Sequence, residues 1–322
     1  MTRGRVVITG IGVAGPLGLG RAALDAALDA GLVPTSLGEI RLEDYLDTEK
    51  TYLDPNSRLT LCATALALAD AGLPLVAETP GVVGMSFGTR LGNVTTTESY
   101  MKGVREQGVK LASPLLFIHA YPNTSVSLAA IEFGIKGTNS NFNTGRSSSL
   151  QALVQSADVL RRGRMSVMLA GSADTYTDVT RTDALGVPFR GAVTFVTERA
   201  VDAMARGARP TVEIAGGGMA GTIKGAFSQA LAEASLGRPE VDWVLVDGAV
   251  DDDFRVHTTD LLKTVGDCGS ATASLGVALA ALAIAGGKRP VGLGLPEAPR
   301  TAAVVSVDDA GAAAVILHGL TD

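Results

Sequence analysis

Short apolar runs alternate with longer amphipathic runs along nearly the whole of this chain of 322 residues. The short runs are rich in Val and Ala and predict buried strands, whereas the longer runs repeat their apolar residues at the spacing of a helix. Strands separated by helices require crossover connections, so the pattern predicts a layered α/β fold. The predicted strands are 5–11, 80–88, 166–174, 192–197, 243–250, 302–311 and 312–319, and the predicted helices are 20–31, 57–72, 149–164, 225–237 and 272–287.

Composition narrows the setting of the protein. Hydrophobic residues make up 46% of the chain and aromatic residues only 4%, so Ala, Val and Leu must build the core. A net charge of −6 argues against a nucleic-acid or anionic-membrane partner. Cys62 and Cys268 lack metal-ligand spacing, no signal-peptide pattern precedes the first predicted strand, and no apolar run reaches the ~18 residues of a membrane span. We therefore expect a cytoplasmic protein.

Gly10, Gly12 and Gly15 follow the start of the first predicted strand in the spacing G-x-G-x-x-G, which is typical of dinucleotide-binding loops. Such a site also needs an acidic residue at the end of a second strand, ~20 residues further on. The stretch that follows contains no such strand, and Pro16 comes directly after the third glycine. We interpret the glycines as a tight turn after a buried strand, and an NAD(P)-dependent oxidoreductase stays an alternative.

Longer motifs carry a more specific pattern. They are VVITGIGV near the start, VVGMSFGTRLGN at 82–93, VLRRGR followed by MLAGS between 159 and 172, and GAVTFVTERAVDAMARGARPTVEIAG at 191–216. In this order the motifs resemble those of a β-ketoacyl synthase of the thiolase superfamily, and the resemblance covers most of the chain. It implies one thiolase-like domain over 1–322, with a layered αβαβα fold built from two related halves at about 1–180 and 190–322.

The resemblance also indicates where catalytic residues would lie. An active β-ketoacyl synthase carries a nucleophilic Cys at the start of its central helix and two His residues that follow strands. The matching positions here hold Arg146, Asp247 and Asp267. Lys263 matches a family Lys with one residue fewer before Asp267, and an acidic pair at 308–309 stands where the family has a gating Phe. A guanidinium cannot attack a thioester, so the resemblance implies a chain without the nucleophile and without both imidazoles.

If the fold is retained, these three charged side chains converge on one buried point. Removing one member of a buried charged pair costs ~3–5 kcal/mol, whereas two carboxylates satisfy the fork of donors on one guanidinium. We therefore predict that Arg146, Asp247 and Asp267 form a charged structural plug.

Synthase-like chains without the active Cys resemble the chain-length factors of type II polyketide synthases. This resemblance implies a non-catalytic subunit without a cofactor, which pairs with an active ketosynthase and shapes its product tunnel. It implies that an acyl carrier protein is reached through the partner. It places an edge strand for pairing across the dimer at 139–143, and tunnel and interface residues in SPLLFIHAYPNTS at 113–125. These residues are Leu116, Phe117, Ala120, Tyr121 and Asn123.

Other polar groups leave alternatives open. Ser147 and its two serine neighbours offer a replacement nucleophile for an acyl-transferring or hydrolysing enzyme, but we expect them to cap and pack a helix. The acidic stretch 251–260, which includes His257, is interpreted as a solvated loop, and we expect no metal there. Three arginines within 161–164 lie at a predicted helix end, where cations complement the helix dipole.

Overall fold

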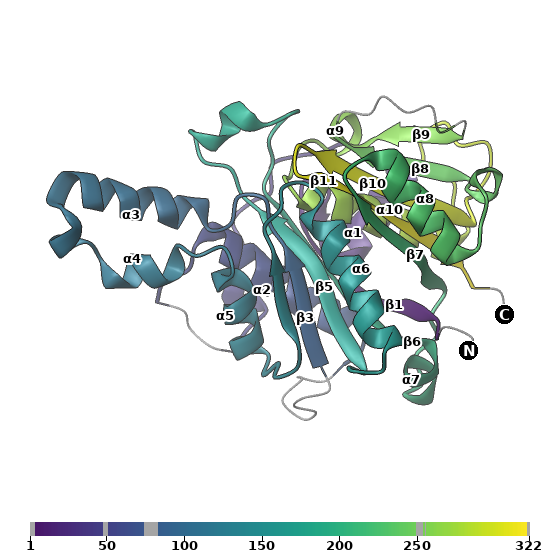
Figure 1. Ribbon diagram of the computed structural model, residues 1–322, viewed down its shortest axis with the longest axis horizontal. Coiled ribbons are helices and arrows are strands. Elements are labelled where there is room, and N and C mark those ends of the chain that lie inside the picture. The colour runs from purple at the N-terminus through teal and green to yellow at the C-terminus, as the bar shows by residue number, and fades with distance from the viewer. Residues whose placement is uncertain (1–3, 48–50, 74–82, 249–253, 255, 321–322) are drawn as a thin grey trace.

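A mixed sheet of eleven strands forms the framework of the part of the chain that the structure describes (Figure 1). The computed structural model describes residues 4–47, 51–73, 83–248, 254 and 256–320. The strand order is β4-β3-β5-β6-β1-β7-β11-β10-β8-β9, and β2 pairs with β1. The strands are β1 (Val6–Gly15), β2 (Gly18–Leu19), β3 (Val83–Gly88), β4 (Asn139–Phe142), β5 (Val167–Asp174), β6 (Gly191–Arg199), β7 (Val212–Ala220), β8 (Trp243–Asp247), β9 (His257–Asp260), β10 (Thr301–Asp308) and β11 (Gly311–Gly319).

Helices cover both faces of the sheet. The five helical runs predicted from the sequence form α1, α2, α6, α8 and α10, within a few residues of the predicted bounds. The helix α2 begins where Asp54 accepts a hydrogen bond from Asn56 N and Pro55 takes the first helical position. The helices are α1 (Gly20–Ala30), α2 (Pro55–Asp70), α3 (Val94–Gln107), α4 (Pro114–His119), α5 (Thr124–Glu132), α6 (Ser148–Arg161), α7 (Ala200–Ala205), α8 (Ile223–Ala234), α9 (Leu261–Thr264) and α10 (Ala271–Gly286).

The strands on the two sides of the contact between β1 and β7 pair in the same sequence of parallel and antiparallel contacts. On one side β1 and β6 are antiparallel, β6 and β5 are antiparallel, and β5, β3 and β4 run parallel. On the other side β7, β11, β10, β8 and β9 repeat these pairings with the same senses. This repetition supports a division of the domain into two related halves, which stays a proposal. Because β6 corresponds to β11, the strand order favours a boundary between Arg199 and Val212.

Both faces of the sheet are packed against helices. Alternate residues of a strand point to opposite faces. In β10, Ala302 and Val304 join the central core that contains α6 and α10, whereas Ala303 and Val305 join the core under α8. A third core lies under α2 and α5, against the other half of the sheet. The layered α/β fold class predicted from the resemblance is therefore confirmed.

The glycines of β1 do not form the predicted turn. The strand continues through Gly10 and Gly12 as far as Gly15. A Cβ on Gly12 would collide with the backbone at Ala63, and one on Gly10 with the backbone at Ala67, so these glycines let α2 pack directly on the strand. The tight-turn interpretation is wrong at these two positions. Because β1 pairs antiparallel with β6 and β7, it also does not open the parallel unit that a dinucleotide site requires.

Besides the two-residue β2, two strands lie where the sequence pattern predicts none. The strand β7 contains the glycines 216–218, and a Cβ on Gly216 or Gly218 would collide with the backbone of α8, so close packing rather than side-chain preference shapes this strand. The strand β9 lies within the stretch interpreted as an acidic loop, so that interpretation is wrong for His257–Asp260. Asp251, Asp252 and Asp253 lie outside the described residues.

Candidate functional site

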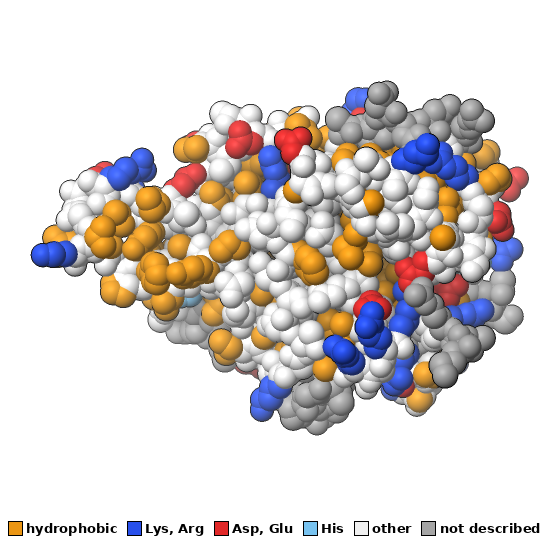
Figure 2. All heavy atoms as spheres, in the orientation of Figure 1, with side chains coloured by type: hydrophobic (Ala, Val, Ile, Leu, Met, Phe, Trp, Pro, Cys, Tyr) orange, Lys and Arg blue, Asp and Glu red, His pale blue; other side chains and the backbone are white. Residues whose placement is uncertain are grey.

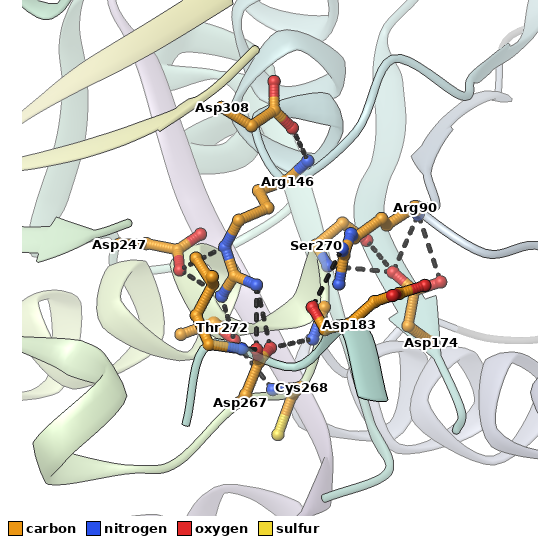
Figure 3. A network of polar contacts seen from close by, with 12 residues as sticks. Arg90, Arg146, Asp174, Asp183, Asp247, Asp267, Cys268, Ser270, Thr272 and Asp308 are labelled. Atoms are coloured by element: carbon orange, nitrogen blue, oxygen red, sulfur yellow. Dashed lines mark hydrogen bonds and ion pairs between the residues drawn. The ribbon is translucent and has the colours of Figure 1, made fainter. Parts of the chain in front are cut away.

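A buried ion cluster lies where α6 begins, beside the end of β8 (Figure 3). The side chain of Arg146, in the turn before α6, is 1% exposed. Its Nε and Nη2 donate to Asp247 Oδ1 at 3.0 and 2.5 Å. Its Nη1 donates to both carboxylate oxygens of Asp267, at 2.9 and 3.0 Å. The structure therefore brings together the three charged residues that the sequence pattern singled out.

The two carboxylates have further donors that fix them in place. Asp247 is the last residue of β8, and its Oδ2 accepts from Ser306 Oγ at 2.8 Å. Asp267 lies between α9 and α10, where its oxygens accept from Tyr176 Oη at 2.8 Å, from Leu185 N at 2.7 Å and from Gly269 N at 2.9 Å. The buried charges are thus both paired and hydrogen-bonded, which is the condition under which a protein interior tolerates them.

Burial and ion pairing act in opposite directions on the cluster. Burial raises the pKa of Asp247 to about 6, against the attraction of Arg146. For Asp267 burial also raises the pKa, but Arg146, the Tyr176 hydroxyl and nearby backbone amides outweigh it, so the pKa lies below its usual value. Burial lowers the pKa of Arg146 and the two carboxylates raise it by more, so the guanidinium stays charged. The cluster combines a permanent cation with a firmly ionised Asp267.

A third carboxylate approaches the cluster from the end of β10. The carboxylate of Asp308 accepts the backbone N–H of Arg146 (Figure 3). Gly145, at φ +96°, lies so close to this carboxylate that a Cβ there would overlap it. The N–H of Arg146, in the turn that leads into α6, is therefore occupied by an anion that belongs to the chain itself.

Lys263 takes no part in the cluster. Its side chain is 85% exposed and its Nζ lies 2.9 Å from Asp260 Oδ2. The partial match of Lys263 to a catalytic family lysine has no geometric counterpart here.

Two of the three serines after Arg146 have hydrogen-bond partners, whereas Ser149 Oγ has none among the described residues. Ser147 Oγ accepts from Gln151 Nε2 at 3.0 Å, and Ser148 Oγ donates to Gly145 O at 2.7 Å. All three serine side chains are buried, and within the described residues no hydrogen bond joins them to a His. A nucleophilic serine needs such a base, so the acyl-transfer alternative gains no support from this part of the structure.

The residues expected at a tunnel or interface lie on a helical lobe formed by α3 and α4, which projects from the body (Figure 1). Figure 2 shows hydrophobic side chains gathered on this lobe. Phe117 is 45% exposed and Tyr121 49% exposed, and their rings meet edge to face with centroids 5.2 Å apart. Leu116, Ala120 and Asn123 belong to the same segment, which lies apart in the chain from the ion cluster.

The remaining polar groups have ordinary surroundings. Arg161 Nη1 donates to Glu233 Oε1 at 2.6 Å, and Arg162 pairs with Asp158 one helical turn away. Over the described ranges, no group of three or more His, Cys, Asp or Glu side chains is placed to hold a metal ion. Among the helices of those ranges, none combines the length and hydropathy that crossing a membrane requires.

Sequence reasoning missed two residues that support the cluster region. Tyr176 links the cluster to the segment after β5 through its hydrogen bond to Asp267. Asp174, the last residue of β5, accepts from Ser270 N and Oγ at 2.8 and 2.6 Å and from Arg90 N at 2.8 Å (Figure 3). The available signal was an acidic residue at the end of an apolar strand, a pattern that Asp174 shares with Asp247.

Comparison with known proteins agrees with the resemblance found in the sequence motifs. The family model of the β-ketoacyl synthase N-terminal domain matches residues 39–208. The tetracenomycin polyketide synthase ketoacyl synthase alpha subunit of Streptomyces glaucescens is 31% identical over 194 residues, which cover 53% of this chain and 46% of that protein. The 3-oxoacyl-[acyl-carrier-protein] synthase 2 of Staphylococcus aureus (strain COL) is 25% identical over 188 residues, which cover 53% and 45%. The chain spans about half the length of the curated relatives it matches.

Solved structures are similar over the full length. The ishigamide ketosynthase/chain length factor superimposes with a TM-score of 0.86 at 20% identity, covering 100% of both chains. A type II polyketide synthase acyl-carrier protein in complex with its ketosynthase gives a TM-score of 0.82 at 18% identity, covering 99% of this chain and 100% of that one. At these identities the likeness establishes the fold.

Proposed function

The chain belongs to the β-ketoacyl synthase family, and we propose that within it the protein is a non-catalytic subunit of the chain-length-factor type. It pairs with an active ketosynthase and shapes the tunnel that receives the growing acyl chain. The observation that carries this proposal is the side chain of Arg146, which fills the start of α6 and is held by two buried carboxylates.

Each group in the cluster is unsuited to acyl transfer. Condensation needs a nucleophile and neighbouring groups that donate or accept a proton. A guanidinium is permanently charged and is not a nucleophile, and the ionised carboxylate of Asp267 only accepts hydrogen bonds. The carboxylate oxygens of Asp247 and Asp267 already accept hydrogen bonds from Arg146 and from nearby donors.

Asp308 adds a second obstacle to catalysis. Acyl transfer passes through an oxyanion that backbone N–H groups stabilise, and the start of a helix is a suitable place for them. The N–H of Arg146 already donates to the carboxylate of Asp308. An oxyanion at this position would meet a fixed negative charge instead of a free donor.

Two surfaces support pairing with a second synthase-like chain. One is the apolar face of the α3–α4 lobe, which includes the exposed side chains of Phe117, Ile118 and Tyr121. The other is β4, which ends the sheet order on one side. The carbonyl oxygens of Thr138 and Phe142 accept hydrogen bonds from the neighbouring backbone. Because successive residues of a strand direct their backbone groups to opposite sides, the N–H of Asn141 points toward the open edge of the sheet. Edge strands with free N–H groups are templates for pairing.

The test is co-expression with a ketosynthase encoded beside this chain, followed by size-exclusion chromatography and intact-mass measurement. We expect a 1:1 complex in which an acyl thioester loads the ketosynthase and leaves the mass of this chain unchanged. An acyl adduct on this chain would contradict the non-catalytic assignment.

Asn141→Pro tests the edge separately. Proline removes an N–H that faces outward and is tolerated on edge strands, so the variant should fold but lose the complex. Asn141→Ala keeps the N–H and is the matched control, which should retain the complex. A stable 1:1 complex with Asn141→Pro would refute pairing through β4.

A further inference from the structure

The α3–α4 lobe has little buried contact with the rest of the chain. Of the residues of α3 and α4, all of which the structure describes, Thr96 alone is buried. The main contacts of α3 are with α4 and with the turn Val109–Leu111, so the two helices pack chiefly on each other. Side-chain burial therefore contributes little to the direction in which the lobe projects from the body (Figure 1).

A buried polar network holds the root of the lobe. Asn93, directly before α3, is 1% exposed, and its Nδ2 donates to the carbonyl oxygen of His119, at the end of α4, at 2.8 Å. Its Oδ1 accepts from Ser125 Oγ of α5 at 2.7 Å. Thr96 Oγ1 donates to Asp54 Oδ2, directly before α2, at 2.7 Å. These hydrogen bonds join both ends of the lobe to the body, and all of them lie at its root.

Bonds at the root alone leave the direction of the lobe sensitive to small rotations. The helix α3 has 14 residues. At 1.5 Å per residue its length is about 21 Å, so a rotation of about 10° at the root would move its far end by about 4 Å. A contact beyond the root would restrict this rotation.

Glu98, in the second turn of α3, makes such a contact. Thr177 Oγ1, in the segment that follows β5, donates to Glu98 Oε1 at 2.6 Å, and both residues are partly buried. This distance is typical of a hydroxyl–carboxylate hydrogen bond, which is stronger than a hydrogen bond between neutral groups. The bond joins the lobe to a part of the body that lies outside the network at the root.

Thr177 is itself held in place. Its Oγ1 accepts from Thr180 N at 3.2 Å, and its N–H donates to Thr180 Oγ1 at 2.9 Å. The preceding residue, Tyr176, donates from its hydroxyl to Asp267 Oδ1 of the ion cluster at 2.8 Å. The acceptor on the lobe is therefore bonded to a donor that the body fixes.

Glu98 also lies close to the aromatic residues of the lobe. Tyr100, two residues further along α3, packs against Phe117 with ring centroids 5.6 Å apart. Phe117 packs in turn against Tyr121. A change in the direction of α3 would therefore move these three rings together, relative to the body.

We propose that Glu98 is a positioning residue, whose hydrogen bond to Thr177 sets the direction of the α3–α4 lobe and thereby the place of Phe117 in the product tunnel. The effect on the tunnel rests on the subunit role proposed above, whereas the direction of the lobe is a property of this chain alone. Each of the two parts therefore has its own measurement.

Distances between two spin labels measure the direction of the lobe. Lys110→Cys, in the turn between α3 and α4, and Arg164→Cys, after α6, provide exposed label sites, while the native Cys62 and Cys268 are buried. Pulsed electron paramagnetic resonance of the labelled full-length chain gives the distribution of label distances. Addition of Glu98→Ala should shift or broaden this distribution by about 4 Å, the displacement expected for a rotation of about 10°.

Conservative variants separate the hydrogen bond from a general loss of structure. Glu98→Gln keeps an acceptor oxygen and should retain the wild-type distribution, and so should Thr177→Ser, which keeps the hydroxyl. Thr177→Val should reproduce the effect of Glu98→Ala. Glu106→Ala is the matched control, because Glu106 is an exposed acid of α3 that pairs with Lys102 inside the lobe. An unchanged distribution in Glu98→Ala, or an equal change in Glu106→Ala or Glu98→Gln, would overturn the positioning role.

The assembled synthase tests the second part. Glu98→Ala should broaden the range of product lengths, measured by mass spectrometry, and Glu98→Gln should restore the wild-type range. The melting temperatures should stay within about 1 °C of the wild type, since the bond lies near the surface. Failure to form the 1:1 complex would contradict the subunit role, and the label distances would still decide the direction of the lobe. A complex whose products stay the same in Glu98→Ala would overturn the effect of Glu98 on the tunnel.

Discussion

Removing the guanidinium of Arg146 is the sharpest test of the buried cluster. Arg146→Ala leaves Asp247 and Asp267 buried and without their cation, because four of the hydrogen bonds to their oxygens come from this side chain. The free energy of unfolding of the variant should therefore be lowered both by the desolvation of the two unpaired carboxylates and by their mutual repulsion.

The expected size follows from the burial of the pair. Breaking a buried ion pair by removing one partner costs ~3–5 kcal/mol. A chain of 322 residues has an unfolding entropy of about 0.7 kcal/mol/K, from about 2.1 cal/mol/K per residue. The melting temperature should therefore fall by about 4–7 °C at pH 7.5. At pH 5 the loss should be smaller, because the orphaned carboxyl groups can take up protons.

Differential scanning calorimetry at both pH values measures this effect. Arg164→Ala removes an exposed arginine of the same size and should shift the melting temperature by less than about 1 °C. Replacing all three members, with Arg146→Leu, Asp247→Asn and Asp267→Asn, should recover most of the loss, since no unpaired charge remains. A shift with Arg146→Ala as small as that of the exposed control would refute the reasoning.

The other predictions concern a carboxyl, a glycine and the lobe. The pKa of Asp247 is raised to about 6 in the folded protein, from ~3.9 in the unfolded chain. Its contribution to the free energy of unfolding is therefore full below about pH 4 and is lost as the pH rises through 6. The difference in unfolding free energy between the wild type and Asp247→Asn, measured by denaturant titration, should fall between pH 4 and 7. Gly12→Ala should cost about 3 kcal/mol by forcing α2 off β1, whereas Gly38→Ala, with open space around it, should cost little. Phe117→Ala should lengthen the products of the assembled synthase, measured by mass spectrometry, and Ile131→Ala on α5 should not.

The sequence pattern was sufficient for elements whose side chains carry the signal. The helix α6 repeats its apolar residues at helical spacing, whereas α10 and the strands β5, β10 and β11 are nearly continuous apolar runs that differ in length. The strand β7 was not predicted, because its glycines have no side chains whose spacing could indicate a strand. These glycines allow α8 to pack closely on the strand. The lobe escaped because α3 and α4 have little buried surface of their own.

The residues of the ion cluster also differ in how well the sequence predicts them. The sequence predicted the cluster because Arg146, Asp247 and Asp267 stand at the three positions where the β-ketoacyl synthase motifs have one Cys and two His. Asp308 was visible only as an altered loop, since nothing local indicates that its carboxylate reaches a backbone N–H 162 residues away.

The repeated strand order explains why the cluster holds the two sets of strands together. Asp174 ends β5 and accepts the N–H of Ser270, the residue directly before α10. Asp308 ends the corresponding strand β10 and accepts the N–H of Arg146 before α6. Each acid therefore places a negative charge at the start of the helix that belongs to the other set, where the helix dipole favours it. The same contact cannot leave the N–H of Arg146 free for an oxyanion. This one hydrogen bond thus stabilises the fold and also occupies an N–H that an oxyanion would need. Under the proposed non-catalytic role, Asp308→Ala should weaken the fold without giving acyl transfer, because Arg146 offers no nucleophile.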